Sequence, residues 1–353
     1  MVELAELLRR HWPEYERQFG AQVLRSHRRA VQAILACRTA RLGGELYRCP
    51  DCQQDHFVYH SCNHRACPRC GQADASDWIQ RQKLKLLPVP YYLVTFTVPE
   101  GLRPWLRSHQ KAGYSGLLQQ SAAALQDVAS REKYLGAQLG LLSVLHTWGR
   151  QLQYHPHVHC VVPAGGLRAD GLRWCEPKNP DFFLPQIVLA ARFRNRLKTA
   201  LQAQEDFDQI PSEVWRQKWI VDVQPVGSGE PAIKYLSAYV YRTALGSQRI
   251  LADQDGQVTF QYKDSRTQHS CTLTLGALEF IRRFLQHVLP QGFQRVRYYG
   301  WLAAAATARW QRILALLDWQ APARPPAPPR STPPCPHCGA PLVWIGTLSR
   351  APP

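Results

Sequence analysis

The chain has 353 residues, 45% of them hydrophobic, which is typical of a globular protein with two or three domains. Lys and Arg outnumber Asp and Glu by 43 to 26, and the formal net charge of +17 favours a polyanionic partner, either nucleic acid or an anionic membrane surface. No apolar run approaches the ~20 residues that span a bilayer, and the N-terminus lacks the basic start and apolar core of a signal peptide. We therefore expect a nucleic-acid-binding protein, with a merely basic soluble protein as the plainer alternative.

Two helices are predicted in the N-terminal part of the chain. Residues 14–40 carry basic residues beside apolar ones at helical spacing. A second helix is predicted over residues 77–87, DWIQRQKLKLL, and it stops at Pro88. The surrounding LPVP stretch is a plausible hinge into a new domain.

The segment between these helices is dense in cysteine and histidine. Two Cys-x-x-Cys pairs, Cys49 with Cys52 and Cys67 with Cys70, have the spacing of a zinc ribbon or knuckle. Four thiolates around Zn²⁺ leave no open position, so we expect a structural ion. Disulfides are not expected, since no export signal is recognised. Four further residues are candidates for a second ion or for substitute ligands of the first: Cys37, His60, Cys62 and His64.

Basic residues flank the cysteines and suggest that this module docks on DNA. They are Arg65, Arg69, Arg81, Lys83 and Lys85. A solvated basic face is the alternative, and for any one of these residues it is the more common role.

From about residue 89 the pattern becomes mixed α and β, with strands bounded by prolines and glycines and helices between them. The predicted strands are residues 91–99, 140–149, 154–166 and 219–226. Helices are predicted between 103 and 137, over 185–203 and from Pro231 onwards. A hairpin, ILADQDGQVTFQY, and a helix, GALEFIRRFLQHVL, follow towards residue 300.

The third of these strands begins YHPHVHCVVPAGG and has histidine at every second position. Alternate side chains of a strand share a face, so His155, His157 and His159 are expected to project together, with Val158 and Cys160 on the other side. Neighbours on one face lie ~7 Å apart, which allows two imidazoles to bind one ion. We predict His157 and His159 as ligands of a divalent cation. A solvent-facing strand with coincidental histidines is the alternative.

The helix from Pro231, PAIKYLSAYVYRTALG, pairs a buried stripe with two tyrosines. Ile233, Leu236 and Val240 recur at helical spacing, whereas Tyr235 and Tyr239 lie one turn apart on another face. Taken alone, two such tyrosines are more often packed against the core.

The C-terminal tail differs in composition from the rest. Residues 321–334 hold seven prolines, as in an extended linker. Cys335 and Cys338 follow in CPHCGAPL and make half of a zinc site, which needs ligands from elsewhere or from another chain, or else is a remnant.

Together the histidines and tyrosines suggest phosphoryl chemistry. A divalent cation polarises phosphodiester oxygens, and a tyrosine hydroxyl can then attack phosphorus and release a DNA 3′-OH. The covalent phosphotyrosine preserves the bond energy for rejoining.

Several motifs occur in the order found in one known family. HPHVHCVVPAGG, YLSAYVYR and FIRRFLQHVLPQGFQRVRYYGWL resemble the insertion-sequence family numbered ninety-one, whose members are rolling-circle transposases of the HUH (histidine–hydrophobe–histidine) class with two tyrosines. The resemblance extends from about Arg38 to Trp301.

The resemblance implies an α+β fold: an HUH endonuclease domain with a central antiparallel sheet flanked by helices, a small N-terminal zinc-binding domain and a Pro-rich tail. We expect these regions at residues 89–300, 1–88 and 301–353. It implies Tyr235 and Tyr239 as catalytic residues, His157 and His159 as ligands of Mg²⁺ or Mn²⁺, and a third ligand among His146, Gln151 and His155.

It further implies cleavage of single-stranded DNA through a 5′-phosphotyrosine and recognition of hairpin-forming element ends. The expected location is the bacterial cytoplasm, in association with the nucleoid. DNA contacts are expected from Arg65, Arg69, Lys234 and Arg242.

Two rival functions remain open at this stage. A rolling-circle replication initiator or relaxase uses the same chemistry on its own origin. A zinc-containing DNA-binding regulator without catalysis would bind duplex DNA and would not nick it.

Overall fold

The computed structural model describes residues 2–70, 72–179, 182–241, 244–264, 267–323 and 332–350. It divides into two compact units, each built from separate stretches of sequence. Unit 1 comprises Met1–Asp74, Tyr241–Val288 and Arg324–Pro353, and unit 2 comprises Ala75–Val240 and Leu289–Ala323. The sequence suggested three consecutive regions instead. The difference arises because strands that are distant in sequence pair within each unit, and because cysteines from both ends of the chain meet in unit 1.

Unit 2 is organised around a five-stranded sheet in the order β12-β4-β5-β3-β8, with every neighbouring pair antiparallel. Its strands are β3 (Tyr91–Thr97), β4 (Gly140–Trp148), β5 (Tyr154–Pro163), β8 (Ile220–Pro225) and β12 (Val296–Gly300). The short strands β6 (Gly166–Leu167) and β7 (Trp174–Cys175) form a separate ribbon. The four strands predicted from the sequence are confirmed, as is the antiparallel sheet.

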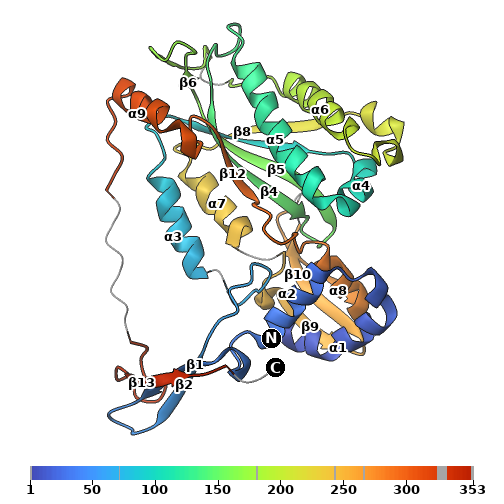
Figure 1. Ribbon diagram of the computed structural model, residues 1–353, viewed down its shortest axis with the longest axis vertical. Coiled ribbons are helices and arrows are strands. Elements are labelled where there is room, and N and C mark those ends of the chain that lie inside the picture. The colour runs from blue at the N-terminus through green and yellow to red at the C-terminus, as the bar shows by residue number, and fades with distance from the viewer. Residues whose placement is uncertain are drawn as a thin grey trace. The chain divides into compact units, whose positions relative to one another are not determined.

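Helices cover both faces of this sheet. They are α3 (Gln72–Lys83), α4 (Arg103–Ser108), α5 (Gln110–Ala129), α6 (Gln186–Gln202), α7 (Glu230–Tyr241) and α9 (Thr307–Leu316). Figure 1 shows α4, α5 and α6 on one face, with α3 and α7 on the other. The α5 face holds the main core, where Phe96, Val158 and Phe193 are completely or almost completely buried.

The two faces of β5 differ in chemistry because its side chains alternate. Val158 and Cys160 point into the core, and Cys160 contacts Ser121 of α5. His157 and His159 therefore face the opposite side, which is the side of α7. The alternation predicted for this strand is confirmed.

The described residues of unit 1 form two small sheets and three α-helices. The helices are α1 (Leu4–Phe19), α2 (Arg25–Ala36) and α8 (Ala277–Leu285), and the strands are β1 (Gly44–Arg48), β2 (Asp55–Tyr59), β9 (Ile250–Gln254), β10 (Gln257–Lys263), β11 (Ser270–Gly276) and β13 (Val343–Leu348). One sheet has the order β11-β10-β9 and the other β13-β1-β2. The predicted hairpin is confirmed: Asp255 and Gly256 at its turn both have positive φ, as a type I′ turn requires.

The single helix predicted over residues 14–40 was wrong in its bounds. The structure has α1 and α2 instead, separated by a 3₁₀ turn at Gly20–Gln22. Leu24 is extended, with φ −68° and ψ 152°, and this breaks the helical path before α2. The prolines predicted as a linker over 321–334 fall largely outside the described residues. Among the described helices, none is both long and apolar enough to cross a membrane.

Candidate metal and tyrosine site

Three histidines from two neighbouring strands meet on the α7 face of the sheet. His146 of β4 lies opposite His157 of β5 in the ladder, and His159 follows on the same side of β5. All three side chains are buried, and each offers a ring nitrogen within 4.8 Å of those of the other two. Of the third ligands considered from the sequence, His146 is the one that joins this group, which we call the histidine triad.

Hydrogen bonds orient the two triad members of β5. Nδ1 of His157 lies 2.7 Å from the backbone carbonyl oxygen of His155 and donates to it. Nδ1 of His159 lies 3.0 Å from the hydroxyl of Thr95 on β3. Both contacts engage Nδ1, so the Nε2 atoms are directed towards the centre of the triad. Partners of this kind hold metal-binding imidazoles in orientation.

Burial also sets the charge of these rings. Desolvation keeps the pKa of His157 well below its ordinary value, and it lowers the pKa of His159 to about 4. At neutral pH both rings are therefore uncharged, which is the form that binds a cation.

The triad fits a divalent cation. Nδ1 of His146 lies 2.8 Å from Nε2 of His157, so the two nitrogens share a proton that a cation would replace. Ligands at about 2.1 Å from one ion lie roughly 3–4 Å apart, a spacing that these rings reach with small rotations. Three protein ligands leave positions open for substrate oxygens.

The other two candidates for a third ligand lie outside this group. His155 is half-buried at the start of β5, with its ring centroid 5.1 Å from that of His157. It contributes its backbone carbonyl to the triad rather than its ring. Gln151 is exposed in the turn between β4 and β5.

Glycines bring α7 back over the histidine face. The chain leaves the edge strand β8 at Pro225, and Gly227 and Gly229 adopt φ of +58° and +81° before α7 begins at Glu230. Side chains other than glycine rarely adopt such angles. The apolar residues Ile233, Leu236 and Val240 are buried, as the helical spacing predicted.

Tyr235 of α7 lies against the triad. Its ring and that of His159 meet edge to face, with centroids 5.9 Å apart and an interplanar angle of 87°. The side chain of Tyr235 remains 44% exposed, whereas His159 is only 5% exposed. The phenol therefore stands between the buried imidazoles and solvent.

Of the other predicted site residues in or after α7, the structure describes the side chain of Lys234 but not those of Tyr239 and Arg242. Tyr239 lies one turn after Tyr235 in α7, but its side chain is outside the described residues. Arg242 is also outside them. Lys234 is exposed beside Tyr235.

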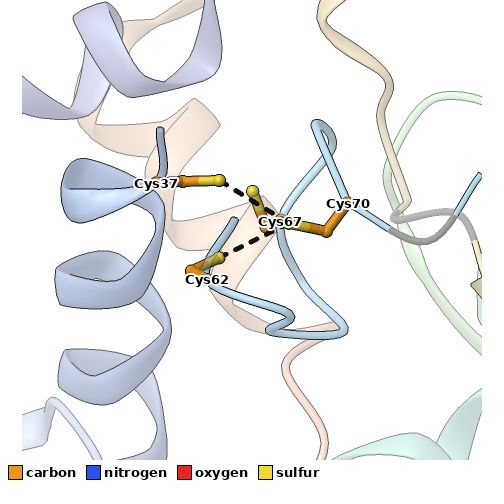
Figure 2. Close-up of side chains that lie close together, drawn as sticks. All are labelled: Cys37, Cys62, Cys67 and Cys70. Carbon is orange, nitrogen blue, oxygen red and sulfur yellow. Dashed lines mark hydrogen bonds between the residues drawn. The ribbon is translucent and has the colours of Figure 1, made fainter. Parts of the chain in front are cut away.

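Four cysteines of unit 1 form a second candidate metal site. Cys37 follows α2, and Cys62, Cys67 and Cys70 come from the loop after β2. Their sulfur atoms lie within 4.8 Å of one another and point to a common centre (Figure 2). Cys37 and Cys67 are buried and the other two half-buried. We call this set the first cysteine cluster.

The structure corrects the grouping of the cysteines. We predicted that Cys49, Cys52, Cys67 and Cys70 bind one ion, but the two pairs belong to different clusters. Cys67 and Cys70 join Cys37 and Cys62, while Cys49 and Cys52 lie with Cys335 and Cys338. The reason is the β1–β2 hairpin, which carries the first pair away from the loop that holds the second.

Neither of the two candidate histidines of this segment belongs to a cluster. His60 is paired with Glu45, at 3.7 Å, and the ring Nδ1 of His64 accepts a hydrogen bond from the backbone of Ala66. His60 therefore contacts strand β1, and His64 contacts its own loop.

The basic residues around the cysteines have partners in the fold. Arg69 is paired with Glu3 and donates to the carbonyl oxygen of Cys37. Arg65 is half-buried, and burial lowers its pKa. On α3, Arg81 pairs with Asp77 and Lys83 with Glu230. The Lys85 ammonium lies 4.2 Å from the centroid of the Tyr298 ring.

Two family models match parts of this chain. A family model described as "Putative transposase" matches residues 140–309, which include the triad and α7. Another, described as "Transposase zinc-binding domain", matches residues 7–98, which include the first cysteine cluster.

Two curated relatives match most of the chain. "Putative transposase y4qJ" of Sinorhizobium fredii (strain NBRC 101917 / NGR234) is 36% identical over 320 residues, which are 85% of this chain and 80% of the relative. "Transposase for insertion sequence element IS801" of Pseudomonas savastanoi pv. phaseolicola is 29% identical over 290 residues, 77% of this chain and 69% of the relative.

Among solved structures, the conjugative relaxase TrwC in complex with oriT DNA shows a weak likeness. The TM-score is 0.25 and the identity 16%, over 65% of this chain and 73% of that one. The family is shown by sequence instead. With both matched domains and 36% identity to a transposase over most of both proteins, this chain belongs to the IS91 family of two-tyrosine transposases with an N-terminal zinc-binding domain.

Proposed function

We propose that this transposase cuts and rejoins single-stranded DNA at the ends of its element, with the Tyr235 hydroxyl as nucleophile. The contact between Tyr235 and His159 is the observation that carries the proposal. A nucleophile must lie beside the groups that activate the phosphate, and Tyr235 is the exposed residue next to the triad.

His146, His157 and His159 would hold the catalytic cation, Mg²⁺ or Mn²⁺. Bound there, the cation would polarise the phosphoryl oxygens of the DNA strand and neutralise charge that develops on them. The protein keeps the rings of His157 and His159 neutral by burial and orients them through the carbonyl of His155 and the hydroxyl of Thr95.

Tyr235 would perform the covalent step. Its oxygen attacks phosphorus in line while the bond from phosphorus to the 3′-oxygen breaks. The phenolic proton passes to water, and the departing oxygen takes up a proton to become a 3′-OH. The product is a phosphodiester between the tyrosine oxygen and the 5′ end of the DNA. A new 3′-OH can attack its phosphorus and displace the tyrosine, and this reverse reaction rejoins the DNA.

Tyr239 would serve as the second nucleophile. It follows Tyr235 by four residues in α7, and residues at that spacing lie on one side of a helix. Two tyrosines allow one protein to hold a cleaved end while a second strand is attacked.

The charge of the chain supports a DNA partner. The formal net charge is +17, and Lys234 is exposed next to the nucleophile, where a phosphate contact would position the strand. Hairpin-forming element ends are the substrate that we propose.

A cleavage assay tests the proposal. The purified full-length chain is incubated with Mn²⁺ and a single-stranded oligonucleotide that carries an element end, and the products are separated under denaturing conditions. We expect nicked DNA and a covalent protein–DNA adduct, both abolished by a chelator. Duplex binding without any nick would indicate a non-catalytic regulator. Nicking of a supercoiled origin without joining to a target would indicate a replication initiator or relaxase.

A further inference from the structure

The C-terminal cysteine pair completes a cluster with cysteines from the other end of the sequence. Sγ of Cys49 lies 3.5 Å from that of Cys338, and Sγ of Cys52 lies 3.6 Å from that of Cys335. Cys52 is also 3.3 Å from Cys49 and 3.4 Å from Cys338. We call these four residues the second cysteine cluster, and all of them belong to unit 1. Cys335 and Cys338 lie far outside the zinc-binding match at residues 7–98.

The sulfur separations fit a tetrahedral metal site and exclude disulfides. Bonded sulfurs would be ~2.05 Å apart, and all four thiols are free. Four thiolates about 2.3 Å from one Zn²⁺ form a tetrahedron with edges of about 3.8 Å. The observed separations of 3.3–3.6 Å are close to such edges.

The two cysteine pairs also share one backbone turn. In CPDCQ the amide of Gln53 donates to the carbonyl oxygen of Cys49, at 3.0 Å, and in CPHCG the amide of Gly339 donates to that of Cys335, at 2.9 Å. The amide of the first cysteine donates to the carbonyl oxygen five residues later in both turns. These bonds run from Cys49 to Gln54, at 2.9 Å, and from Cys335 to Ala340, at 2.8 Å.

The residue that follows each Cys-x-x-Cys pair has a left-handed backbone conformation in both turns. Gln53 has φ of +55° and Gly339 has φ of +78°. Two equivalent turns that present four thiols to one point are a pattern that metal ligation explains and chance packing does not.

A three-stranded sheet holds the two turns at the same end. β13 pairs with β1 antiparallel, with Arg48 opposite Val343. Arg48 immediately precedes Cys49, and Val343 follows shortly after Cys338. Around the sulfurs, Cys49, Cys335 and Leu342 are buried together.

We propose that Cys49, Cys52, Cys335 and Cys338 bind a second structural Zn²⁺, separate from the first cysteine cluster, which fastens the C-terminal tail to the β1–β2 hairpin of the same chain. The zinc-binding domain of this protein is then discontinuous: its second site is half N-terminal and half C-terminal. This inference does not depend on the cleavage chemistry.

Zinc content tests the proposal on the full-length protein. Mass spectrometric metal analysis should give two Zn²⁺ per wild-type chain. The double variant Cys335→Ser/Cys338→Ser should hold one, as should Cys37→Ser/Cys70→Ser. The matched control Cys175→Ser/Cys271→Ser removes two thiols outside both clusters and should hold two. One Zn²⁺ in the wild type, or two in the Cys335→Ser/Cys338→Ser variant, would overturn the proposal.

Alkylation of the wild type gives a readout that needs no variant. Cys338 is exposed, so as a free thiol it would react quickly with iodoacetamide. We expect it to react only after a zinc chelator is added, as mapped by peptide mass spectrometry. Equal reaction before and after chelation would rule out ligation.

A mixing experiment separates a site within one chain from a site shared between chains. Cys49→Ser/Cys52→Ser and Cys335→Ser/Cys338→Ser are unfolded together, refolded together with Zn²⁺ and analysed. Ligation within one chain predicts one Zn²⁺ per chain in the mixture. A rise above one would show that a tail from another copy completes the site, against the proposal.

Discussion

The phenol of Tyr235 and the imidazole of His159 meet edge to face, 5.9 Å between centroids, although 76 residues separate them in sequence. One comes from a helix and the other from the central strand of the sheet. The turn with Gly227 and Gly229 brings them together. The proposed chemistry depends on this contact, and each prediction below concerns it or the residues that support it.

Removal of the Tyr235 hydroxyl should abolish the first cleavage. Tyr235→Phe keeps the ring and its packing on His159 but has no nucleophilic oxygen. We expect no covalent adduct and at least a ~1,000-fold slower nick in the Mn²⁺ assay, since another nucleophile would have to act. The control Tyr262→Phe alters a half-buried tyrosine of unit 1 and should cleave at the wild-type rate. Cleavage at that rate by Tyr235→Phe would contradict the assignment.

The triad should bind the cation without help from the His155 ring. His146→Ala, His157→Ala and His159→Ala should each weaken Mn²⁺ binding by more than the roughly 10–100-fold that loss of an orienting partner costs. His155→Ala keeps the backbone carbonyl that His157 uses and should stay within a few-fold of wild type. Isothermal titration with Mn²⁺ measures this, and a reversed order of effects would assign the third ligand to His155.

Thr95 should act by holding His159 in place. Thr95→Val has the same shape but cannot hydrogen-bond Nδ1 of His159, so we expect Mn²⁺ affinity to fall about 10–100-fold. Thr95→Ser restores the hydroxyl and should restore affinity. If valine binds Mn²⁺ as well as threonine, the hydrogen bond has no positioning role.

Acid should destabilise the metal-free protein through His159. Its pKa is lowered to about 4 in the folded state, against ~6.5 when unfolded. The unfolded chain therefore binds more protons between these values, so stability is lost as the pH falls from 6.5 towards 4. Between pH 7 and pH 5 the expected loss is about 2 kcal/mol for this ring. Urea unfolding of chelator-treated protein at both pH values measures the free energy of unfolding. In His159→Gln, the loss of this free energy between pH 7 and pH 5 should be smaller by about 2 kcal/mol. An identical dependence in both would show that His159 is not buried in its neutral form.

The strand and helix that carry this site could be predicted from sequence, because their patterns are local. Alternation placed His157 and His159 on one face, and helical spacing separated Tyr235 from the buried stripe of α7. The contribution of Thr95 could not be predicted, since it depends on the register between β3 and β5.

The grouping of the cysteines could not be predicted from local sequence patterns. Cys-x-x-Cys spacing identifies half-sites, but it does not say which halves combine. Cys67 lies nearer to Cys52 in sequence than Cys335 does, yet the β1–β2 hairpin and the pairing of β13 with β1 favour the distant pair. The break between α1 and α2 was missed for a related reason: the basic and apolar pattern continues through the turn at Gly20–Gln22.

The most direct test of the account is to locate the DNA on the protein. The covalent adduct formed with Mn²⁺ and an element-end oligonucleotide is digested with trypsin and nuclease, and the modified peptide is sequenced by mass spectrometry. Cleavage after Lys234 gives a peptide that starts at Tyr235, and the account predicts phosphonucleotide on Tyr235 or, after a second transfer, on Tyr239. An adduct on any other residue, or DNA cleavage with no adduct at all, would contradict it.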